Sequence, residues 1–395
     1  MNHLRKLAAF ALACLMLFSA GAALAEKVTL KVWGSQDNQE LLGQLIDEFK
    51  AANADVEWDI SLGVVGEPDA LARYNEDPDA AADLFSFPNN VLSEFVNADA
   101  LFEVMVHLDE IKAANTAGSI ESATLGEYLY GYPMTADNGY FMYYDKSVYS
   151  EEDVQTLDGM LAKAAEAGKK VLMDVSNGWY IASFFLGAGC ELGKDENGKG
   201  ICDFNSPAGL AAAEAIKAFC ANEAFITGDN DVLVGGIGTT IAAGVSGTWN
   251  ATAIKEKLGE NYAACKLPTF TCGGEQVQMA SFIGTKIMGV NTQTDFPLEA
   301  MKLAEFLTGE EAQIKFFEVR EFGPTNIVAA SNPAVLENAA LAALSAQSAH
   351  AISQKMVPDG YWSPAEAFGL ELETKATADL DLQGLLDNMV AQITQ

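Results

Sequence analysis

The chain has 395 residues, of which 50% are hydrophobic, and its 55 acidic side chains outnumber 23 basic ones for a formal net charge of -32. This length predicts two or three globular domains, and so large a hydrophobic fraction excludes an intrinsically disordered chain. The excess of acids argues against nucleic acid as a partner, because a phosphate backbone is bound mainly by Lys and Arg.

The first 25 residues have the pattern of an export signal. A basic start and an apolar run over residues 7–18 precede Ala23-Leu24-Ala25, which is a small-x-small cleavage signal. The apolar run is too short to cross a bilayer as a stable helix. We therefore expect cleavage after Ala25 and an exported protein, in the periplasm or at the cell surface. Lipid attachment through Cys14 is the less favoured alternative, because the residues before it form a poor lipobox.

The segments that follow predict an α/β fold. Apolar residues alternate over 28–32, which indicates a strand, and they recur at helical spacing over 41–49. A second alternating run covers 56–60. Strand, helix and strand in this order form a βαβ unit with a parallel sheet. Further strands are predicted over 84–87 and 140–144.

Three stretches that contain Gly or Pro interrupt the regular pattern of the chain after this unit. They are Gly131-Tyr132-Pro133, the segment 273–284 and Gly323-Pro324-Thr325. Between and after them, the Ala-rich segments 208–218 and 334–351 predict helices, because Ala has the highest helix propensity. Repeated breaks at this spacing suggest a chain that crosses more than once between two lobes.

Cysteines are placed where disulfides are reasonable in an exported protein. Cys190 and Cys202 flank a turn-like segment over 193–198, so that a cross-strand disulfide could close this hairpin. Cys265 and Cys272 bracket a short segment and could form a second disulfide. The remaining cysteine of the exported chain is then expected to be a buried thiol.

A set of short motifs extends over nearly the whole chain. The motifs are Leu129-Tyr130-Gly131-Tyr132-Pro133-Met134 leading to Tyr143-Tyr144-Asp145-Lys146, then Gly247-Thr248-Trp249-Asn250, Lys266-Leu267-Pro268-Thr269-Phe270, Phe306-Leu307-Thr308-Gly309-Glu310-Glu311-Ala312-Gln313 and Tyr361-Trp362-Ser363-Pro364. As an ordered set they resemble the extracellular solute-binding proteins of sugar ABC transporters, the group that contains maltose- and maltodextrin-binding proteins.

The resemblance implies two α/β lobes, each a mostly parallel sheet flanked by helices, with three hinge crossings and a ligand cleft between the lobes. This agrees with the three breaks, and with the rule that ligands lie beyond the carboxyl ends of parallel strands. We expect residues 26–136 plus 283–334 to form lobe I and residues 137–282 plus 335–395 to form lobe II. Ligand would close the lobes by a hinge rotation, and a membrane permease would recognise the closed form.

A sugar offers hydroxyls that donate and accept hydrogen bonds together with flat C–H faces, so its site needs planar polar groups and aromatic rings. The resemblance implies that Trp249 stacks on the sugar, because relatives place a Trp at this Gly-x-Trp position. Asn177, Trp179 and Tyr180 stand where relatives carry an acid followed by a stacking aromatic. Asn177 replaces that acid, so the hydroxyl contact would persist without the charge.

Relatives carry another aromatic ligand contact near the C-terminus. The resemblance implies that Tyr361 and Trp362 occupy this position, with Phe368 as a competing candidate. Asp137 follows the Tyr-Pro motif at the first crossing, where relatives place an acid that faces the ligand. The alternative for Asp137 is an ordinary turn residue.

Loops after the first strands supply the other candidates. Asp37 and Asn38 follow the first strand, where helix N-capping is the competing role. Phe87, Asn89 and Asn90 follow a later strand, at a position where maltodextrin binders carry a Trp and an Asp-Arg pair. Neither of those is present here, which puts maltose itself in doubt.

These residues predict high-affinity binding of a neutral sugar by a monomer that needs no cofactor. Several aromatic candidates favour an oligosaccharide, because stacked rings need successive flat faces. Delivery to an ABC transporter permease is implied by the family. A ligand sensor that presents its closed form to a receptor would have the same pocket. The sequence does not distinguish such a sensor from a transport protein that delivers its ligand to a permease.

Other site chemistries are compatible with parts of the sequence. Tyr143-Tyr144 resembles the paired tyrosines of ferric-ion binders, but the family places this pair in a hinge strand. Asp229-Asn230-Asp231 faintly resembles a calcium loop, yet it lacks the distant Glu of an EF-hand, and a solvated turn is the better interpretation. A zinc site is not expected, because the exported chain has only His107 and His350.

A secreted glycoside hydrolase is the alternative from another functional class. Paired carboxylates are abundant, but any chain this acidic contains such pairs, and the separation of specific carboxyl groups cannot be read from sequence. No Gly-x-Ser-x-Gly nucleophile motif occurs, and both remaining His residues have structural settings. We therefore expect a binding protein and no enzyme.

Overall fold

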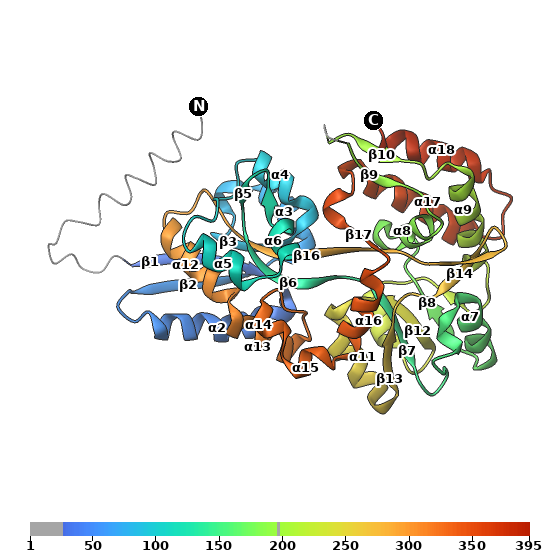
Figure 1. Cartoon of the computed structure of the whole chain (residues 1–395), viewed down its shortest axis with the longest axis horizontal. Helices are drawn as coiled ribbons and strands as arrows, with labels where there is room; N and C mark the ends of the chain where they lie inside the picture. Colours follow the sequence, from blue (N-terminus) through green and yellow to red (C-terminus); the bar gives the residue numbers. More distant parts are fainter. Residues whose placement is uncertain (1–26, 196–197) are drawn as a thin grey trace.

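The computed structural model describes residues 27–195 and 198–395. The predicted export signal, its cleavage site after Ala25 and the alternative anchor Cys14 lie outside the described residues. Figure 1 shows two lobes of α/β structure placed end to end along the longest axis, with long strands running between them. No helix in the described part of the chain is long and apolar enough to cross a membrane.

Lobe I is built on one mixed sheet. Its strand order is β17 (Ala351–Ser353), β16 (Ser281–Val290), β3 (Leu84–Pro88), β1 (Val28–Gly34) and β2 (Trp58–Val64), and β6 (Tyr132–Gly139) also pairs with β16. Strand β1 is parallel to both β2 and β3, whereas β16 is antiparallel to β3 and β6. The βαβ unit predicted at the start of the chain is confirmed as β1, α2 (Gln39–Ala52) and β2.

Lobe II contains a second mixed sheet. Its order is β11 (Phe225–Ile226), β8 (Lys170–Leu172), β12 (Ile241–Ser246), β7 (Phe141–Asp145) and β13 (Tyr262–Cys265). The first three of these strands are mutually parallel, and β7 runs antiparallel to both of its neighbours. Three two-stranded hairpins complete the strands: β4 (Thr124–Leu125) with β5 (Tyr128–Leu129), β9 (Leu192–Lys194) with β10 (Gly200–Cys202), and β14 (Thr269–Cys272) with β15 (Glu275–Gln278).

Helices cover the sheets of both lobes (Figure 1). Lobe I carries α2, α3 (Ala70–Glu76), α4 (Leu92–Asn97), α5 (Leu108–Ala114), α6 (Ala117–Ser122), α12 (Pro297–Leu307) and α13 (Glu310–Arg320). Lobe II carries α7 (Leu157–Glu166), α8 (Gly178–Gly187), α9 (Pro207–Cys220), α10 (Asn230–Gly236), α11 (Ala251–Leu258), α16 (Ala339–Ser348), α17 (Trp362–Lys375) and α18 (Leu382–Ile393). Two short helices, α14 (Ile327–Ala330) and α15 (Pro333–Leu336), lie on the segment between them.

The helix predicted for the first Ala-rich segment is formed, whereas the second Ala-rich segment is divided among several elements. Segment 208–218 is confirmed as part of α9. Segment 334–351 is divided between α15, α16 and the start of β17. The division falls at Asn338, whose side-chain oxygen accepts from the backbone N–H of Leu341 and so begins a new helix.

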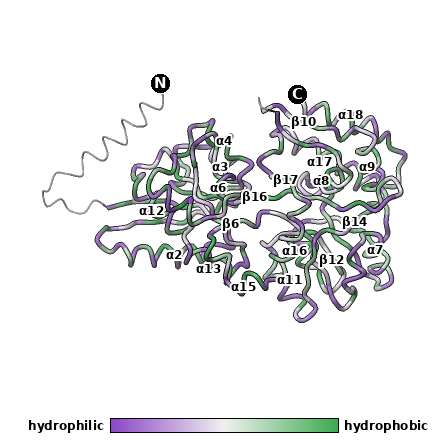
Figure 2. Tube along the Cα trace, in the orientation of Figure 1, coloured by the Kyte–Doolittle hydropathy of each residue, from purple (hydrophilic) through white to green (hydrophobic). Residues whose placement is uncertain are grey.

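Each lobe has its own hydrophobic core, and the crossing strands contribute to both. Strand β6 packs Tyr132 into the lobe I core, whereas Tyr140 just after it belongs to the lobe II core. Strand β16 likewise places Phe282 in lobe II and Ile287 in lobe I. Figure 2 shows apolar residues along the inner strands of both lobes and hydrophilic residues on many outer turns. The exact lobe boundaries stay a prediction. The change from one core to the other along β6 and β16 is consistent with them.

The structure does not form the two predicted disulfides. Cys190, Cys202, Cys265 and Cys272 are free thiols, as is Cys220. The predicted hairpin between the first pair is present as β9 and β10, although residues 196 and 197 of its turn lie outside the described part of the chain. Burial raises the pKa of Cys190 to about 11 and that of Cys202, Cys220 and Cys265 to about 12.

Candidate functional site

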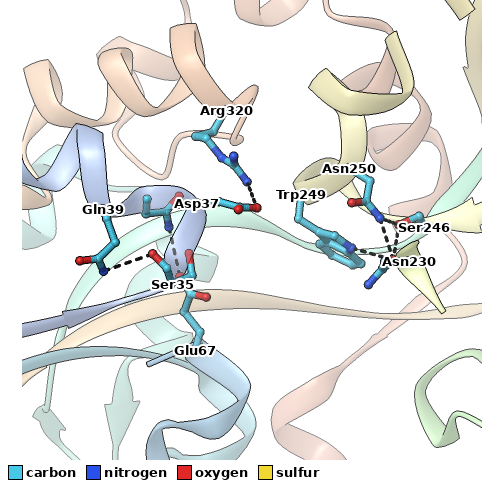
Figure 3. Close-up of polar contacts among 10 residues, drawn as sticks. Ser35, Asp37, Gln39, Glu67, Asn230, Ser246, Trp249, Asn250 and Arg320 are labelled. Carbon is cyan, nitrogen blue, oxygen red and sulfur yellow. Dashed lines mark hydrogen bonds and ion pairs between the residues drawn. The ribbon is translucent and has the colours of Figure 1, made fainter. Parts of the chain in front are cut away.

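Polar and aromatic residues gather at the carboxyl ends of the parallel strands in both lobes. In lobe I, the neighbouring strands β3, β1 and β2 lead into the 3-10 helices η5 (Asn89–Val91), η2 (Gln36–Asn38) and η3 (Glu67–Asp69). In lobe II, β8, β11 and β12 lead to α8, α10 and η7 (Thr248–Asn250). Ligands of open parallel sheets bind at such strand ends. Figure 3 shows residues from the two lobes facing one another there.

The lobe I wall consists of Asp37, Asn38, Glu67, Asn89 and Asn90. Asn38 is only 1% exposed and donates from Nδ2 to Oε1 of Glu67 at 3.4 Å, while its own Oδ1 has no partner among the described residues. Nδ2 of Asn89 and Oδ1 of Asn90 are also buried and unpaired within the described chain. Buried polar atoms are normally paired, so these atoms identify a surface suited to hydroxyl groups.

Asp37 has a different setting at the edge of this wall. Its side chain is 66% exposed and its Oδ2 lies 3.1 Å from Nη2 of Arg320. The guanidinium of Arg320 also lies over the ring of Phe322, 5.6 Å from its centroid. Neither Asp37 nor Asn38 makes a side-chain N-cap hydrogen bond, so the competing helix-capping role is not realised.

Glu67 was not among the sequence candidates. It is 6% exposed and forms no ion pair within the described chain, so its carboxylate is buried with only an amide contact from Asn38. An acid in the loop after a predicted strand is the same signal that selected Asp37. The predicted βαβ unit already places this loop beside the loop after β1, so the same reasoning could have selected Glu67.

The lobe II wall consists of Asn177, Trp179, Tyr180, Asn230 and Trp249. The rings of Trp179 and Trp249 lie 5.6 Å apart with an interplanar angle of 31°. Trp179 is half-buried, and its Nε1 is buried without a partner among the described residues. These two rings form an aromatic surface with an unpaired donor at its edge.

Trp249 is positioned by the glycine of its motif and by Asn230. A Cβ on Gly247 would overlap the Trp249 ring and would lie 2.6 Å from the carbonyl oxygen of Gly139. Oδ1 of Asn230 accepts from Nε1 of Trp249 at 3.3 Å, from Oγ of Ser246 at 3.1 Å and from Nδ2 of Asn250 at 2.7 Å (Figure 3). The sequence interpretation of Asn230 as part of a solvated turn missed this role.

Asn177 and Tyr180 flank Trp179 at the start of α8. Oδ1 of Asn177 accepts from the backbone N–H of Trp179 at 2.9 Å and caps the helix. This leaves the two N–H donors of its amide available. Tyr180 packs edge-on against Tyr140 with centroids 5.1 Å apart, and burial raises its pKa.

A small cavity opens in the lobe II wall. It has a volume of about 100 Å³ and is lined by Leu172, Asp174, Asn177, Tyr180, Gly228, Asp229, Asn230 and Val245. A larger cavity of about 510 Å³ lies in lobe I between β2 and α3, lined by Lys31, Trp33, Gly63, Val64, Val65, Arg73, Glu76, Asp77 and Ala80. The larger cavity includes no residue of either wall, so size alone does not identify the site.

Two sequence candidates lie in the hydrophobic cores and not at the walls. Phe87 is fully buried in the lobe I core, because all residues of β3 are covered on both faces of the sheet. Tyr361 is also fully buried, and its hydroxyl donates to the carbonyl oxygen of Gly178 at 2.6 Å. The competing residue Phe368 is 3% exposed, which leaves Trp362 as the half-buried aromatic of this region.

Asp137 connects the hinge crossings. It is 1% exposed, and its Oδ2 accepts from Oγ1 of Thr248 at 2.6 Å and from the backbone N–H of Gly323 at 2.8 Å. The first crossing is thereby tied to the third crossing and to η7 of lobe II. Its Oδ1 is buried without a partner among the described residues, so its contact with a ligand stays a prediction.

The tyrosine pair considered for iron does not converge. Tyr143 belongs to one hydrophobic cluster of lobe II and Tyr144 to another, because successive residues of β7 point to opposite faces of the sheet. The Tyr143 hydroxyl donates to the carbonyl oxygen of Gly247 at 3.0 Å, and burial raises its pKa well above the ordinary value. Among the described residues, no group of three or more His, Cys, Asp and Glu side chains is arranged to hold a metal ion.

Comparison with known proteins shows the family of the chain. The model of the family described as bacterial extracellular solute-binding protein matches residues 44–343. The chain is 25% identical over 383 residues to the galactooligosaccharide-binding protein of Bacillus subtilis (strain 168), covering 91% of this chain and 87% of that protein.

Solved structures share the fold over nearly the whole chain. A structure determined with acarbose is similar with a TM-score of 0.83 and 30% identity, covering 93% of this chain and 99% of its own. Maltodextrin binding protein MalE1 from L. casei BL23, solved without ligand, has a TM-score of 0.78 and 25% identity, with coverage of 93% and 99%. The two-lobed α/β fold expected from the sequence is confirmed.

Proposed function

This chain belongs to the bacterial extracellular solute-binding proteins, and we propose that it binds a neutral oligosaccharide between its two lobes and delivers it to an ABC transporter permease. The observation that carries the proposal is the Trp179 and Trp249 pair beside unpaired polar groups at the strand ends of both lobes. Aromatic faces bind the C–H surfaces of sugar rings, and the amide and carboxyl groups bind hydroxyls.

The proposed cycle is a hinge closure around the sugar. Residues of both walls would contact the ligand together only when the lobes approach, so ligand favours the closed form by its higher affinity for it. The three crossings would act as the hinge, with Asp137 linking two of them. Export of the chain, its action as a monomer and its contact with a permease belong to the same proposal.

Binding without chemical change is part of the proposal. The galactooligosaccharide-binding and maltodextrin-binding relatives are named as binding proteins. A hydrolase with the same cleft would release reducing ends from an oligosaccharide. We expect the sugar to be recovered unchanged after prolonged incubation, and release of reducing ends would favour the hydrolase alternative.

The test is calorimetric titration of the chain from Glu26 with maltotriose, β-1,4-galactotriose, xylotriose and ferric iron. We expect a saturable response to at least one trisaccharide, and replacing Trp249 by Ala should weaken it by about 1–3 kcal/mol, judged by the area that an aromatic side chain buries.

Trp58→Ala is the matched control. This residue packs against Phe49 at 4.8 Å in lobe I, far from both walls, so that its loss should lower stability and leave affinity unchanged. A response to iron alone, or equal affinity in the Trp249 variant and the wild type, would contradict the proposal.

A further inference from the structure

We infer that the cavity of about 100 Å³ in the lobe II wall is a subsite for the exocyclic hydroxymethyl group of a hexose unit. This inference rests on the proposed sugar binding and names the sugar class that the site selects. A hexopyranose carries such a group, whereas a pentopyranose has only hydrogen at that position.

Two residues that line the cavity also contact the two tryptophans, although neither tryptophan lines it. Asn230 lines the cavity and accepts from the Trp249 indole at 3.3 Å. Asn177 lines it as well and accepts from the backbone N–H of Trp179 at 2.9 Å. A sugar ring stacked on this surface therefore has the cavity beside it, within reach of a substituent that projects from the ring.

The lining of the cavity combines apolar and polar groups in the way a hydroxymethyl group requires. Leu172, Val245 and the ring of Tyr180, which is 7% exposed, provide apolar contacts for a CH₂ group. Asp174 has one oxygen engaged by Oγ of Ser176 at 2.9 Å and a second oxygen that can accept from a hydroxyl.

Asn230 supplies the matching donor. Its Oδ1 is fully engaged by three donors, so its amide nitrogen turns away from them and carries two N–H groups on the exposed side of the residue (Figure 3). A hydroxyl donates one hydrogen bond and accepts others, which an acid and an amide together satisfy. The polar groups of the cavity thus suit a hydroxyl better than they suit either a pure donor or a pure acceptor.

The size and charge of the cavity suit a neutral hydroxymethyl group. A volume of about 100 Å³ is ample for a hydroxymethyl group, since roughly 10–15 Å³ of such space holds one water molecule. Two of the lining residues, Asp174 and Asp229, are acids, and none is Lys or Arg. The carboxylate of a uronic acid would meet like charge there, so acidic sugars are disfavoured.

The test compares hexose and pentose chains on wild-type protein and on one conservative variant. Affinities for maltotriose, β-1,4-galactotriose and xylotriose are measured by titration calorimetry. Asn230→Asp keeps the oxygen that holds Trp249, Ser246 and Asn250, but it replaces the amide donor of this cavity-lining residue by an acceptor. Asn388→Asp, an exposed position on α18, adds the same charge elsewhere in lobe II.

We expect the better hexose trisaccharide to bind at least about tenfold more tightly than xylotriose, and Asn230→Asp to weaken it about tenfold, with a smaller loss for xylotriose. Asn388→Asp should match the wild type. Xylotriose binding as tightly as the better hexose chain, or hexose affinity unchanged in Asn230→Asp, would overturn the subsite assignment alone. Failure of all three sugars to bind would instead contradict the proposed function.

Discussion

Nε1 of Trp249 donates to Oδ1 of Asn230 at 3.3 Å, which joins the helix that follows β11 to the turn that follows β12. This bond orients the half-buried ring of Trp249, which also packs against the hydrophobic core of lobe I. Because the same oxygen also accepts from Ser246 and Asn250, one amide orients a whole section of the wall.

Asn230→Ala and Trp249→Phe should have coupled effects on sugar affinity. The alanine variant removes the acceptor of the indole, and the phenylalanine variant removes the donor while keeping an aromatic ring. Residues in direct contact show interaction energies of about 0.5–3 kcal/mol in double-mutant cycles. Calorimetry on both single variants and the double variant measures this coupling, and additive losses would show that Asn230 does not act through Trp249.

Glu67→Gln should weaken sugar binding by about 1–2 kcal/mol without lowering the free energy of unfolding. The carboxylate is 6% exposed and lacks a cationic partner in the described chain, so removing its charge relieves a desolvation cost. A hydrogen bond from a sugar hydroxyl to a charged acceptor is stronger than one to an amide oxygen.

Urea unfolding and calorimetry separate these two effects of the Glu67 variant. Glu40→Gln, at an exposed position in the first turn of α2, is the control and should leave affinity unchanged. A Glu67 variant with lower stability and normal affinity would assign Glu67 to the fold alone.

Asp137→Ala should lower the free energy of unfolding by about 1–3 kcal/mol, because it leaves the Thr248 hydroxyl and the Gly323 N–H without their acceptor. The lost contacts join two crossings, so the distribution between open and closed lobes should shift as well. Urea unfolding reports the first effect and small-angle scattering the second. Unchanged values in both measurements would mean that the hinge does not depend on Asp137.

Asp145→Asn should lower stability at neutral pH and not in acid. Burial raises the pKa of Asp145, but hydrogen bonds from Ser147 and the ion pair with Lys169 at 3.0 Å outweigh it and lower the pKa overall. Because the pKa of Asp145 is lower in the folded chain than in the unfolded chain, its ionised form stabilises the fold. This stabilisation is complete above the unfolded pKa of about 3.9, and it is lost as the pH falls through the folded pKa.

Urea unfolding of the Asp145 variant at pH 7 and at about pH 3 tests this linkage. We expect a deficit of about 1–3 kcal/mol at pH 7 that shrinks in acid. Asp47→Asn, with its side chain 82% exposed, should show no such dependence. A deficit independent of pH would assign the loss to packing.

Thiol titration of the exported chain in denaturant should find five free thiols. Without denaturant the reaction at pH 8 should be slow, since burial raises the pKa of Cys202, Cys220 and Cys265 to about 12 and keeps them protonated. Only the thiolate form reacts. A count of one thiol in denaturant would restore both disulfides that the sequence suggested.

The sequence was informative where the signal is local. Alternation and helical spacing predict β1 and α2. The choice of Trp249 and Trp179 came from the family resemblance, and the structure shows that Gly247 leaves room for the half-buried ring of Trp249.

The sequence failed where the position of a residue depends on the packing of distant segments. Phe87 and Tyr361 were assigned to the cleft, but a strand covered on both faces and a helix start within the core bury them. Asn230 reaches the wall only because β11 pairs with β8, and this pairing has no local signature. Glu67 follows the second strand of the predicted βαβ unit, but its burial beside Asn38 depends on packing that the sequence does not show.

A crystal structure of the chain with the tightest-binding trisaccharide tests the location of the site most directly. We predict a sugar ring stacked within about 4 Å of Trp249 or Trp179, with further contacts from Asn38 or Glu67 on the opposite lobe. A trisaccharide bound in the lobe I cavity between β2 and α3, with both tryptophans free of contact, would contradict the placement of the site between the lobes.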